Sequence, residues 1–287
     1  MIFNIIFKTY PGYNFKKALK AFPTKEILLK FTLTKLIDAI KNYDTKKINL
    51  NIVIDATTPE YLNVVQNKLN QSGLEYKIIF NDKPYGNEEC FATCLDQTVN
   101  LKNSFIFFIE DDYLIHPRIF HVFEKLFCNK VTPQYLLPYT HPDYNSLFVH
   151  KFYSFLKFKK ISSSFTPRAS GCLTFITTTE EFRKDINVFR LFSKKILGDH
   201  NTWKVLTMPF ISFHTIMREL IFSKKYKLQS LKVILRSMFK FRRPLVASTE
   251  LPYGLHLSNE VIPPGYEYIN FEKDPNILYE KYIKKFN

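Results

Sequence analysis

The sequence predicts an α/β protein with an open, mostly parallel sheet flanked by helices, followed by a less regular C-terminal half. Buried-strand patterns and amphipathic-helix patterns alternate from residue 2 to residue 110, in the order that a parallel sheet requires. Hydrophobic residues make up 46% of the 287 residues and aromatic residues 16%, which provides a large core and excludes global disorder. The length fits one large domain.

The first half of the chain reads as four strands joined by three helices. Thr24 is a candidate N-cap of the first helix, and Gly73 ends the second. Because each helix links two consecutive strands, we expect the strands to run parallel. The expected strands are Ile2–Lys8, Ile48–Ala56, Glu75–Phe80 and Ser104–Glu110, and the expected helices are Lys25–Tyr43, Pro59–Ser72 and Asn87–Val99.

The second half has weaker and less regular patterns. A Lys/Arg-rich amphipathic stretch runs from Ser223 to Arg243, and Pro244 ends it. The other expected elements are a helix at Pro117–Asn129, a strand entering a loop at Tyr135–Asn145, a β-rich segment at Ser170–Thr179 and a helix at Glu180–Lys195.

The charge of the chain indicates anionic partners but does not choose among them. The formal net charge is +15 and the isoelectric point is near 9.5, so nucleic acid, an acidic membrane surface and phosphate-bearing substrates are all compatible. The N-terminal segment is too short and too soon interrupted by Lys8 and Pro11 for a signal peptide, and no uncharged apolar run spans a bilayer. We expect a cytoplasmic protein, either soluble or peripheral at a membrane surface.

The four cysteines indicate reduced thiols. They form no CxxC pair, and only Cys90 and Cys94 are close enough to share a helix face. A spacing of four fits buried small side chains as well as a zinc half-site, but no matching Cys/His pair follows. The structural role is therefore the stronger prediction; the other two cysteines are Cys128 and Cys172.

Polar side chains follow all four expected strands at the edge where ligands bind in parallel sheets, beyond the carboxyl ends. Thr9 and Tyr10 follow the first strand, Asp55 the second, and Asn81 to Gly86 the third. Asp55 has an alternative role as a cap of the helix near Pro59.

Three consecutive acids, Glu110, Asp111 and Asp112, follow the fourth strand. Such a triplet suffers like-charge repulsion and desolvation, so a cation should compensate it. A divalent Mg²⁺ or Mn²⁺ takes one or two protein carboxylates and completes its shell with phosphate oxygens and water. The alternative is that Asp111 or Asp112 caps the helix near Pro117.

Five segments in order extend this pattern along the chain. They are "EDDYLIHP" (110–117), "THPDYN" (140–145), "SGCLTF" (170–175), "GDHNTW" (198–203) and "YGLHLS" (253–258). This ordered set resembles the GT-A glycosyltransferases of the family-2 type, found in bacteria and viruses, whose DxD-type motif holds a metal and a nucleotide-sugar on a Rossmann-type sheet. The triplet differs from a strict Asp-x-Asp, no basic residue follows Asp143, and no Thr precedes His256.

The resemblance implies a role for several residues near the metal. Asp112 would ligate the metal, and Glu110 and Asp111 would orient the donor. His256 would supply a further ligand from a late loop, although a lone late histidine is more often structural. Asp199 would be the base that takes the proton of the acceptor hydroxyl, with an ordinary helix N-cap as its alternative.

Donor binding would use the strand-end residues. Thr9, Tyr10, Asp55 and Asn81 would contact the base, ribose or phosphates. Arg168 would contact a phosphate or the acceptor, and a solvated loop arginine is the alternative.

Together these features predict a glycosyltransferase that depends on Mn²⁺ or Mg²⁺. It would move a sugar from a nucleoside-diphosphate-sugar to an acceptor hydroxyl during glycan biosynthesis, with inversion at the sugar. One domain, 1–287, would comprise a nucleotide-sugar half (1–116), an acceptor half (117–260) and a tail (261–287).

The alternative is a basic protein that binds nucleic acid or a membrane surface without catalysis. The interleaved basic and aromatic residues of 223–244 favour it, but no nucleic-acid-binding motif supports it, so nucleic acid is the less expected partner. A nucleotidyltransferase is disfavoured because 7 glycines in the whole chain leave no Gly-rich phosphate loop.

Overall fold

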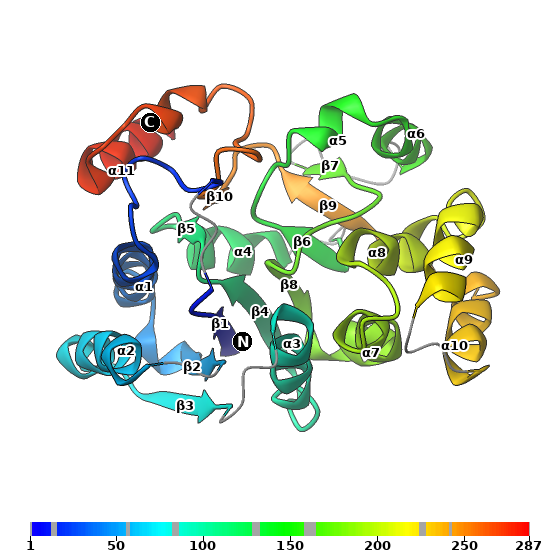
Figure 1. The fold of residues 1–287 in the computed structure, drawn as a ribbon, viewed down its shortest axis with the longest axis horizontal. Coiled ribbons are helices and arrows are strands. Elements are labelled where there is room, and N and C mark those ends of the chain that lie inside the picture. Colours follow the sequence, from blue (N-terminus) through cyan, green and yellow to red (C-terminus); the bar gives the residue numbers. More distant parts are fainter. Residues whose placement is uncertain are drawn as a thin grey trace.

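A mixed eight-stranded sheet forms the centre of the molecule (Figure 1). The computed structural model describes residues 2–12, 16–55, 58–81, 86–127, 133–157, 165–223, 228–240 and 243–286, without the side chains of residues 145 and 157. The strand order is β3-β2-β1-β4-β8-β6-β9-β7, and β3, β2, β1 and β4 run parallel. The strands are β1 (Ile2–Thr9), β2 (Ile48–Ile54), β3 (Tyr76–Phe80), β4 (Ser104–Glu110), β6 (Tyr135–Leu137), β7 (Phe165–Pro167), β8 (Phe175–Thr178) and β9 (Val246–Thr249).

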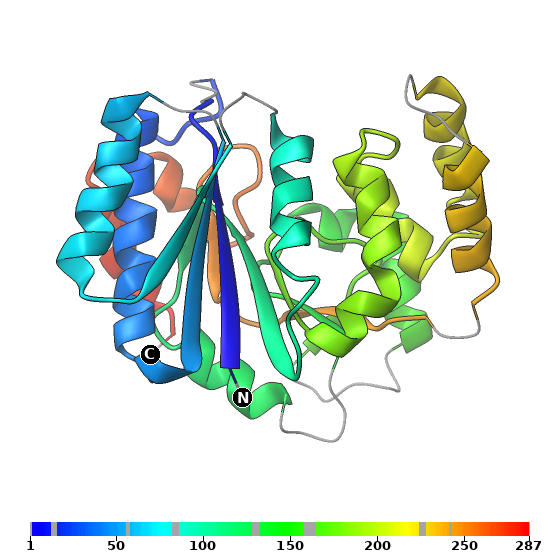
Figure 2. The same ribbon diagram turned by 90° about the horizontal axis from the view of Figure 1, so that it is seen from below.

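Helices cover both faces of this sheet, which confirms the predicted fold class of a mostly parallel α/β sheet (Figure 2). The first core cluster joins the sheet to α1 (Lys25–Lys41), α2 (Pro59–Ser72) and α4 (Ile119–Phe127). The second cluster joins it to helices on the other face. These are α3 (Asn87–Asp96), α7 (Thr179–Ser193), α8 (Asp199–Thr207), α9 (Phe213–Phe222) and α10 (Leu228–Met238).

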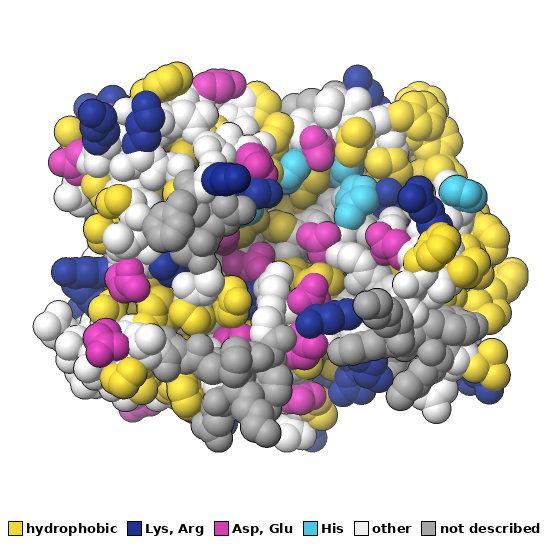
Figure 3. Space-filling view, in the orientation of Figure 1, with side chains coloured by type: hydrophobic (Ala, Val, Ile, Leu, Met, Phe, Trp, Pro, Cys, Tyr) yellow, Lys and Arg dark blue, Asp and Glu magenta, His cyan; other side chains and the backbone are white. Residues whose placement is uncertain are grey.

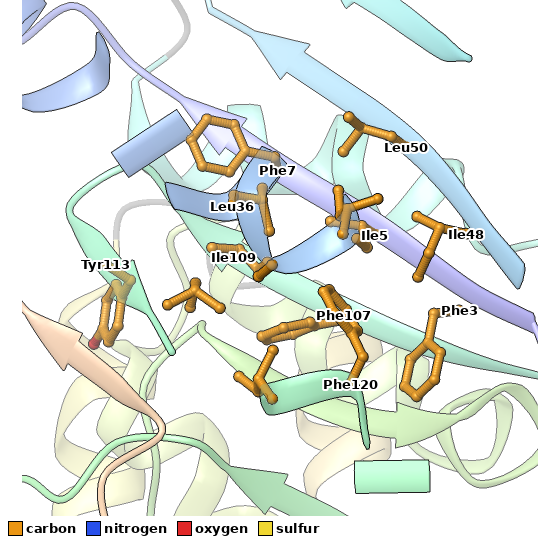
Figure 4. Close-up of a cluster of buried hydrophobic side chains, with 14 of the residues drawn as sticks. Phe3, Ile5, Phe7, Leu36, Ile48, Leu50, Phe107, Ile109, Tyr113 and Phe120 are labelled. Atoms are coloured by element: carbon orange, nitrogen blue, oxygen red, sulfur yellow. The ribbon is translucent and has the colours of Figure 1, made fainter. Parts of the chain in front are cut away.

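Alternation along β1 and β4 builds both clusters at once. Phe3, Ile5 and Phe7 point into the first cluster, where Phe107 of β4 also lies, whereas Ile6 points into the second (Figure 4). Successive side chains of a strand face opposite sides of the sheet, so a central strand with helices on both faces is apolar throughout. The uninterrupted apolar runs of the sequence arise from this double burial.

A second, two-stranded sheet ties the C-terminal part of the chain to the end of β4. In it β5 (Tyr113–Ile115) pairs antiparallel with β10 (Gly254–His256), and His256 lies opposite Tyr113. The α11 helix (Pro275–Lys284) packs through Leu278 and Tyr282 into a third cluster with α1 and both of these strands. Short helices α5 (Asp143–Ser146) and α6 (Phe148–Lys157) and two 3₁₀ turns, Thr45–Lys47 and Glu267–Asn270, complete the described elements.

The predicted elements of the first half are present with small shifts at their ends. Thr24 caps α1 and Gly73 ends α2 in the left-handed conformation, as predicted, while α3 ends at Asp96 instead of Val99. Ala56 lies outside the described residues. Cys90 and Cys94 are free thiols buried on α3, which agrees with the structural role predicted for them.

The second half departs further from the prediction. The strand expected at Tyr135–Asn145 is only the three residues of β6, and the β-rich segment reduces to β8. In the basic stretch the described helix ends at Met238, six residues before Pro244, so the proline does not terminate it. Residues 224–227 and 241–242 of that stretch, like Cys128 and the 82–85 part of the predicted donor loop, lie outside the described residues.

Candidate functional site

Each carboxylate of the acidic triplet has its own cation from a distant part of the chain. Lys8 of β1 lies 2.7 Å from Glu110, and Lys25, the first residue of α1, lies 2.6 Å from Asp111. The Nε2 atom of His256 lies 3.0 Å from Asp112. The cap alternative for the triplet is wrong, because β5 separates it from α4 and these carboxylates bond elsewhere.

Asp111 is an internal anchor. Its residue is 5% exposed; one carboxylate oxygen accepts from Lys25, and the other accepts from the Thr9 hydroxyl at 2.6 Å and the Tyr10 amide at 3.1 Å. Tyr61 also donates to it, at 3.3 Å. Its predicted contact with the donor stays a prediction; in the structure, Asp111 fixes the backbone of the strand end where the donor was expected.

Glu110 is held on the opposite side of β4. Lys8 donates to it and also to Asn87 at the start of α3. Burial raises the pKa of Glu110; Lys8 opposes this, and Asp112 adds to it. Burial would lower the pKa of Lys8, but the contact with Glu110 dominates and holds it above its ordinary range. Glu110 also lines the first cavity described below, while its carboxylate stays paired with Lys8 of β1.

Asp112 and His256 form a pair with one unused oxygen. Burial disfavours the charged forms of both, but their mutual attraction and hydrogen bond dominate: the pKa of Asp112 is lowered and that of His256 raised. The Oδ1 atom of Asp112 is buried and has no hydrogen-bond partner among the described residues. A buried carboxylate oxygen without a partner is costly, so a cation at this point fits the residues present.

The pair would supply two protein ligands. Among the described residues no group of three or more His, Cys, Asp or Glu side chains is arranged as a complete metal site. A two-residue set accords with Mg²⁺ or Mn²⁺, which take part of their shell from phosphates and water. The imidazole of His256 stacks on Tyr113 with ring centroids 4.6 Å apart, which fixes its orientation.

Two cavities meet at His256. The first has a volume of about 390 Å³ and the second about 360 Å³, and both are within the size range of small-molecule sites. Figure 3 shows acidic and histidine side chains gathered in this central hollow. The first is lined by Glu110, Tyr113, His141, Asp143, Tyr144, Leu147, His150, Ser170, Gly171, Cys172, Asp199, His200, His256 and Val261. The second is lined by Gly12, Lys17, Ala18, Lys25, Leu28, Asp112, His256, Leu257, Ser258, Glu260 and Val261.

All five segments singled out in the sequence contribute to the first cavity. The segments span about 150 positions, yet each places at least one residue in the lining. Gly171 of "SGCLTF" is required by space, because a Cβ atom there would lie 2.6 Å from the Leu137 side chain. The segments thus form one wall around one hollow.

Asp199 lies on this wall as the first residue of α8. Gly198 occupies the N-cap position, and the Asp199 carboxylate accepts from the neighbouring His200 amide at 2.6 Å, so the predicted N-cap alternative is wrong. Its side chain faces the open cavity, but the surrounding protein removes part of its hydration, and this desolvation raises its pKa above the ordinary value of 3.8. Glu219 adds to the rise, and His141 and Lys8 oppose it.

A hydrogen-bond chain through Ser170 orients a histidine beside Asp199. His150 accepts the Ala169 amide at Nδ1, 3.2 Å away, so its proton is on Nε2, which lies 3.4 Å from the Ser170 hydroxyl. That hydroxyl accepts from His150 and lies 2.6 Å from Nδ1 of His200, so its own proton is available to that nitrogen. Burial lowers the pKa of His150 to about 3 and of His200 to about 4, so both rings are neutral at pH 7. His200 is thereby held as the Nε2–H tautomer.

Arg168 acts behind the cavity wall. The solvated-loop alternative is wrong, because the residue is buried and its Nε donates to Ser248 at 2.8 Å. Its guanidinium lies over the Tyr144 ring, 4.6 Å from the centroid, and burial lowers its pKa to about 10. Tyr144 lines the cavity, so Arg168 supports that wall; its predicted contact with a phosphate or acceptor stays a prediction.

The strand-end residues predicted for donor binding lie at one edge, as the topology required. Thr9 and Asp55 are fully buried, and Asp55 accepts the Gly86 amide at 2.9 Å. The cap alternative for Asp55 is wrong, because Thr58 caps α2. Asn81 accepts from Thr93, while its side-chain nitrogen is buried without a partner. Tyr10 is the most exposed of the four, and all four remain predictions for donor contact.

No role in the site was predicted from the sequence for His141, His150 or His200. The structure places all three in the cavity lining. The "THPDYN" and "GDHNTW" segments already contained the signal for His141 and His200. His150 lies on α6, outside those segments, and had no such signal.

Comparisons with known proteins give structural similarity only. No protein-family model matches the chain, and no curated protein sequence matches it significantly. Solved structures that are similar to this chain include S. aureus TarS 1–349 in complex with UDP-GlcNAc, with 15% identity and a TM-score of 0.45 over 85% of this chain and 74% of that one. The longer S. aureus TarS matches with 14% identity and a TM-score of 0.47 over 85% of this chain and 44% of that one. The galactosyltransferase LgtC in complex with donor and acceptor sugar analogs matches with 9% identity and a TM-score of 0.42 over 85% of this chain and 72% of that one.

Replacing the anchor should cost stability. Asp111→Ala leaves Lys25 buried without its partner, so the free energy of unfolding should fall by about 3–5 kcal/mol. Asp38→Ala is the matched control, because the Asp38 carboxylate is 47% exposed and lies 3.8 Å from Lys35, so its removal should change stability by about 0–1 kcal/mol. Urea unfolding of the three proteins measures both values. Equal losses in the two variants would contradict the anchor role.

Ser170→Ala should release the tautomer of His200. Without the hydroxyl, Nδ1 of His200 loses its donor, and both neutral tautomers should appear in long-range ¹H–¹⁵N spectra in place of Nε2–H alone. Ser237→Ala, which removes a buried serine bonded only to Val205, is the control and should leave the His200 signals unchanged. An unaltered His200 pattern in Ser170→Ala would show that the serine does not select the tautomer.

Proposed function

We propose that this protein is a metal-dependent glycosyltransferase that moves a sugar from a nucleoside-diphosphate-sugar to an acceptor hydroxyl. The observation that carries the proposal is the convergence of five separate segments on one cavity, with the Asp112–His256 pair at its junction with a second cavity. These are the segments on which the sequence resembles GT-A glycosyltransferases. A structural role alone gives no reason for such segments to share a hollow surface.

Asp112 and His256 are the proposed metal-holding residues. Oδ1 of Asp112 has no hydrogen-bond partner among the described residues, and Nε2 of His256 lies 3.0 Å from Oδ2 of the same carboxylate, so the pair offers one oxygen and one nitrogen donor. Bound there, Mn²⁺ or Mg²⁺ would neutralise charge on the departing diphosphate. His256 must lose its proton to bind a metal, and Asp112 then remains as the charged ligand.

Glu110 and Asp199 lie on the wall of the first cavity, where we place the sugar and the acceptor. Asp199 takes the proton of the acceptor hydroxyl as its oxygen bonds to the anomeric carbon, and the bond from that carbon to the diphosphate oxygen breaks. One such displacement inverts the anomeric configuration. His200, held as the Nε2–H tautomer beside Asp199, would donate a hydrogen bond to the incoming substrate.

A nucleotide panel tests the proposal and the metal together. UDP, UDP-GlcNAc and the other common nucleoside diphosphates and their sugars are added with and without Mn²⁺, and the melting temperature is measured. A ligand that binds only the native state stabilises it by about 2.7 kcal/mol at 100 times its Kd. We expect stabilisation by one nucleotide family, only with the metal, and its loss in Asp112→Asn.

Asp38→Asn controls for a charge change outside the site and should keep the metal-dependent shift. If no nucleotide stabilises the folded protein in the presence of Mn²⁺, the glycosyltransferase proposal is wrong. The non-catalytic alternative, a basic binding protein, would then gain weight.

The pH profile tests Asp199 as the base. A base works deprotonated, and the pKa of Asp199 lies above 3.8, so the rate should fall with falling pH at a point above the ordinary aspartate range. Asp199→Asn should lower kcat by about 10²–10⁴-fold and remove this acid limb. Asp143→Asn changes another carboxylate of the same wall and should retain the limb. A limb that persists in Asp199→Asn would assign the base elsewhere.

A further inference from the structure

The end of the molecule that carries α6, α9 and α10 has an unusual surface. More than half of the large hydrophobic side chains that stay exposed among the described residues lie there. Phe155 is 80% exposed, Phe222 78% and Phe239 73%, against a background of isolated exposed side chains elsewhere. The set comprises Leu147, Phe148, Phe155, Leu156, Phe210, Ile211, Phe213, Ile221, Phe222, Leu228, Leu235 and Phe239.

These side chains lie on the solvent-exposed faces of the helices, where Lys and Arg side chains lie between them. On α10, Leu228, Leu235 and Phe239 share one helical face with the exposed Lys232 and Arg236. The opposite face of α10, with Ile234 and Met238, is buried in the second core cluster. On α6 the exposed Phe148 and Phe155 flank Lys151 at the same spacing.

The helices lie side by side. The Phe210 ring, in the connection between α8 and α9, is 6.3 Å from the Phe239 ring beyond the end of α10. On α6, Tyr153 donates to the Pro244 carbonyl and packs on Met208. In Figure 3, hydrophobic side chains and cations run along this edge of the molecule.

The charge of this region is mainly positive. Its described residues between 208 and 246 include five cations and a single acid, Glu219, and residues 144–179 contain no acid. Glu219 accepts the Gly198 amide at 2.9 Å. Exposed apolar groups that are interleaved with unopposed cations match an anionic lipid surface, where aliphatic chains enter the interface and cations contact headgroups.

We propose that the face formed by α6, α9, α10 and residues 208–212 docks on an anionic membrane surface. The protein would lie on the bilayer, since no helix among the described residues is long and apolar enough to cross it. A second copy of the chain fits less well, because two cations-only faces repel each other. Nucleic acid fits less well, because bases stack on aromatic rings, while Leu156, Ile211, Ile221, Leu228 and Leu235 are aliphatic. The inference does not depend on the glycosyl-transfer proposal.

The test is sedimentation of the whole protein with phosphatidylcholine vesicles, with and without phosphatidylglycerol. We expect binding to the anionic vesicles that weakens with salt but persists, because the apolar part is not screened. Phe155→Ser/Phe222→Ser/Phe239→Ser should lower the partition coefficient at least roughly ten-fold. Lys151→Gln/Lys232→Gln/Arg236→Gln should lower it by roughly five-fold for each charge removed.

A control variant changes three exposed apolar residues outside this face: Val99→Ser/Phe271→Ser/Ile277→Ser. It should bind like the unaltered protein, and circular dichroism should show all variants folded. Failure of the unaltered protein to bind anionic vesicles, or equal loss in the control, would overturn the proposal. The proposal would also be overturned if light scattering showed a dimer that the phenylalanine variant does not form. Oligonucleotide binding that the phenylalanine variant loses would overturn it as well.

Discussion

The pairing of three consecutive carboxylates with three cations from remote parts of the chain organises this structure. Lys8 is opposite Glu110 in the register of β1 and β4, so this pair belongs to the parallel sheet itself. Lys25 brings the start of α1 to Asp111, and His256 brings β10 to Asp112. Each pair relieves a repulsion that the triplet would otherwise create inside the protein. The same contacts therefore align a strand, a helix and the C-terminal half at one point.

The three pairs differ in how many carboxylate oxygens have protein hydrogen-bond donors. This difference distinguishes a carboxylate that holds the fold together from one that is open to a ligand. Both oxygens of Asp111 are occupied by protein donors, whereas Asp112 keeps one buried oxygen without a partner. The cations differ too: a lysine stays charged at neutral pH, but an imidazole can release its proton and become a ligand. Of the three pairs, Asp112–His256 is the one that combines a titratable imidazole with a carboxylate oxygen that has no hydrogen-bond partner among the described residues.

The first half of the fold could be predicted from local sequence patterns. The rest could not be predicted from the sequence, because it depends on pairings between distant residues. Strands β1 to β4 and helices α1 to α3 have periodicity, caps or stop signals within a few residues. Strands β5 and β10 have three residues each and exist because they pair across about 140 positions, so no local signal marks them. His256 entered the predicted site only through a resemblance between sequence segments.

The same limit applies to single residues. Asp111 and Asp112 are adjacent and chemically alike, and only the tertiary neighbours occupy both oxygens of Asp111 while His256 bonds to one oxygen of Asp112. Arg168 looked like a loop residue because burial by Tyr144 and Ser248 comes from segments more than 20 residues away. Candidate residues at the strand ends were predictable, because the ends of parallel strands meet at one edge regardless of side-chain detail.

The distribution of charge finally bears on how a phosphate-bearing substrate would enter. The chain carries a net charge of +15, yet no Lys or Arg lines the first cavity, where Glu110, Asp143 and Asp199 lie with four histidines. Lys17 and Lys25 line the second cavity. A diphosphate placed between the cavities would meet Asp112 and Glu110, which repel it unless a divalent cation intervenes. For the nucleoside-diphosphate-sugar donor that we propose, this acid-rich wall is therefore the reason to expect a metal, because the basic character of the protein as a whole does not extend into the first cavity.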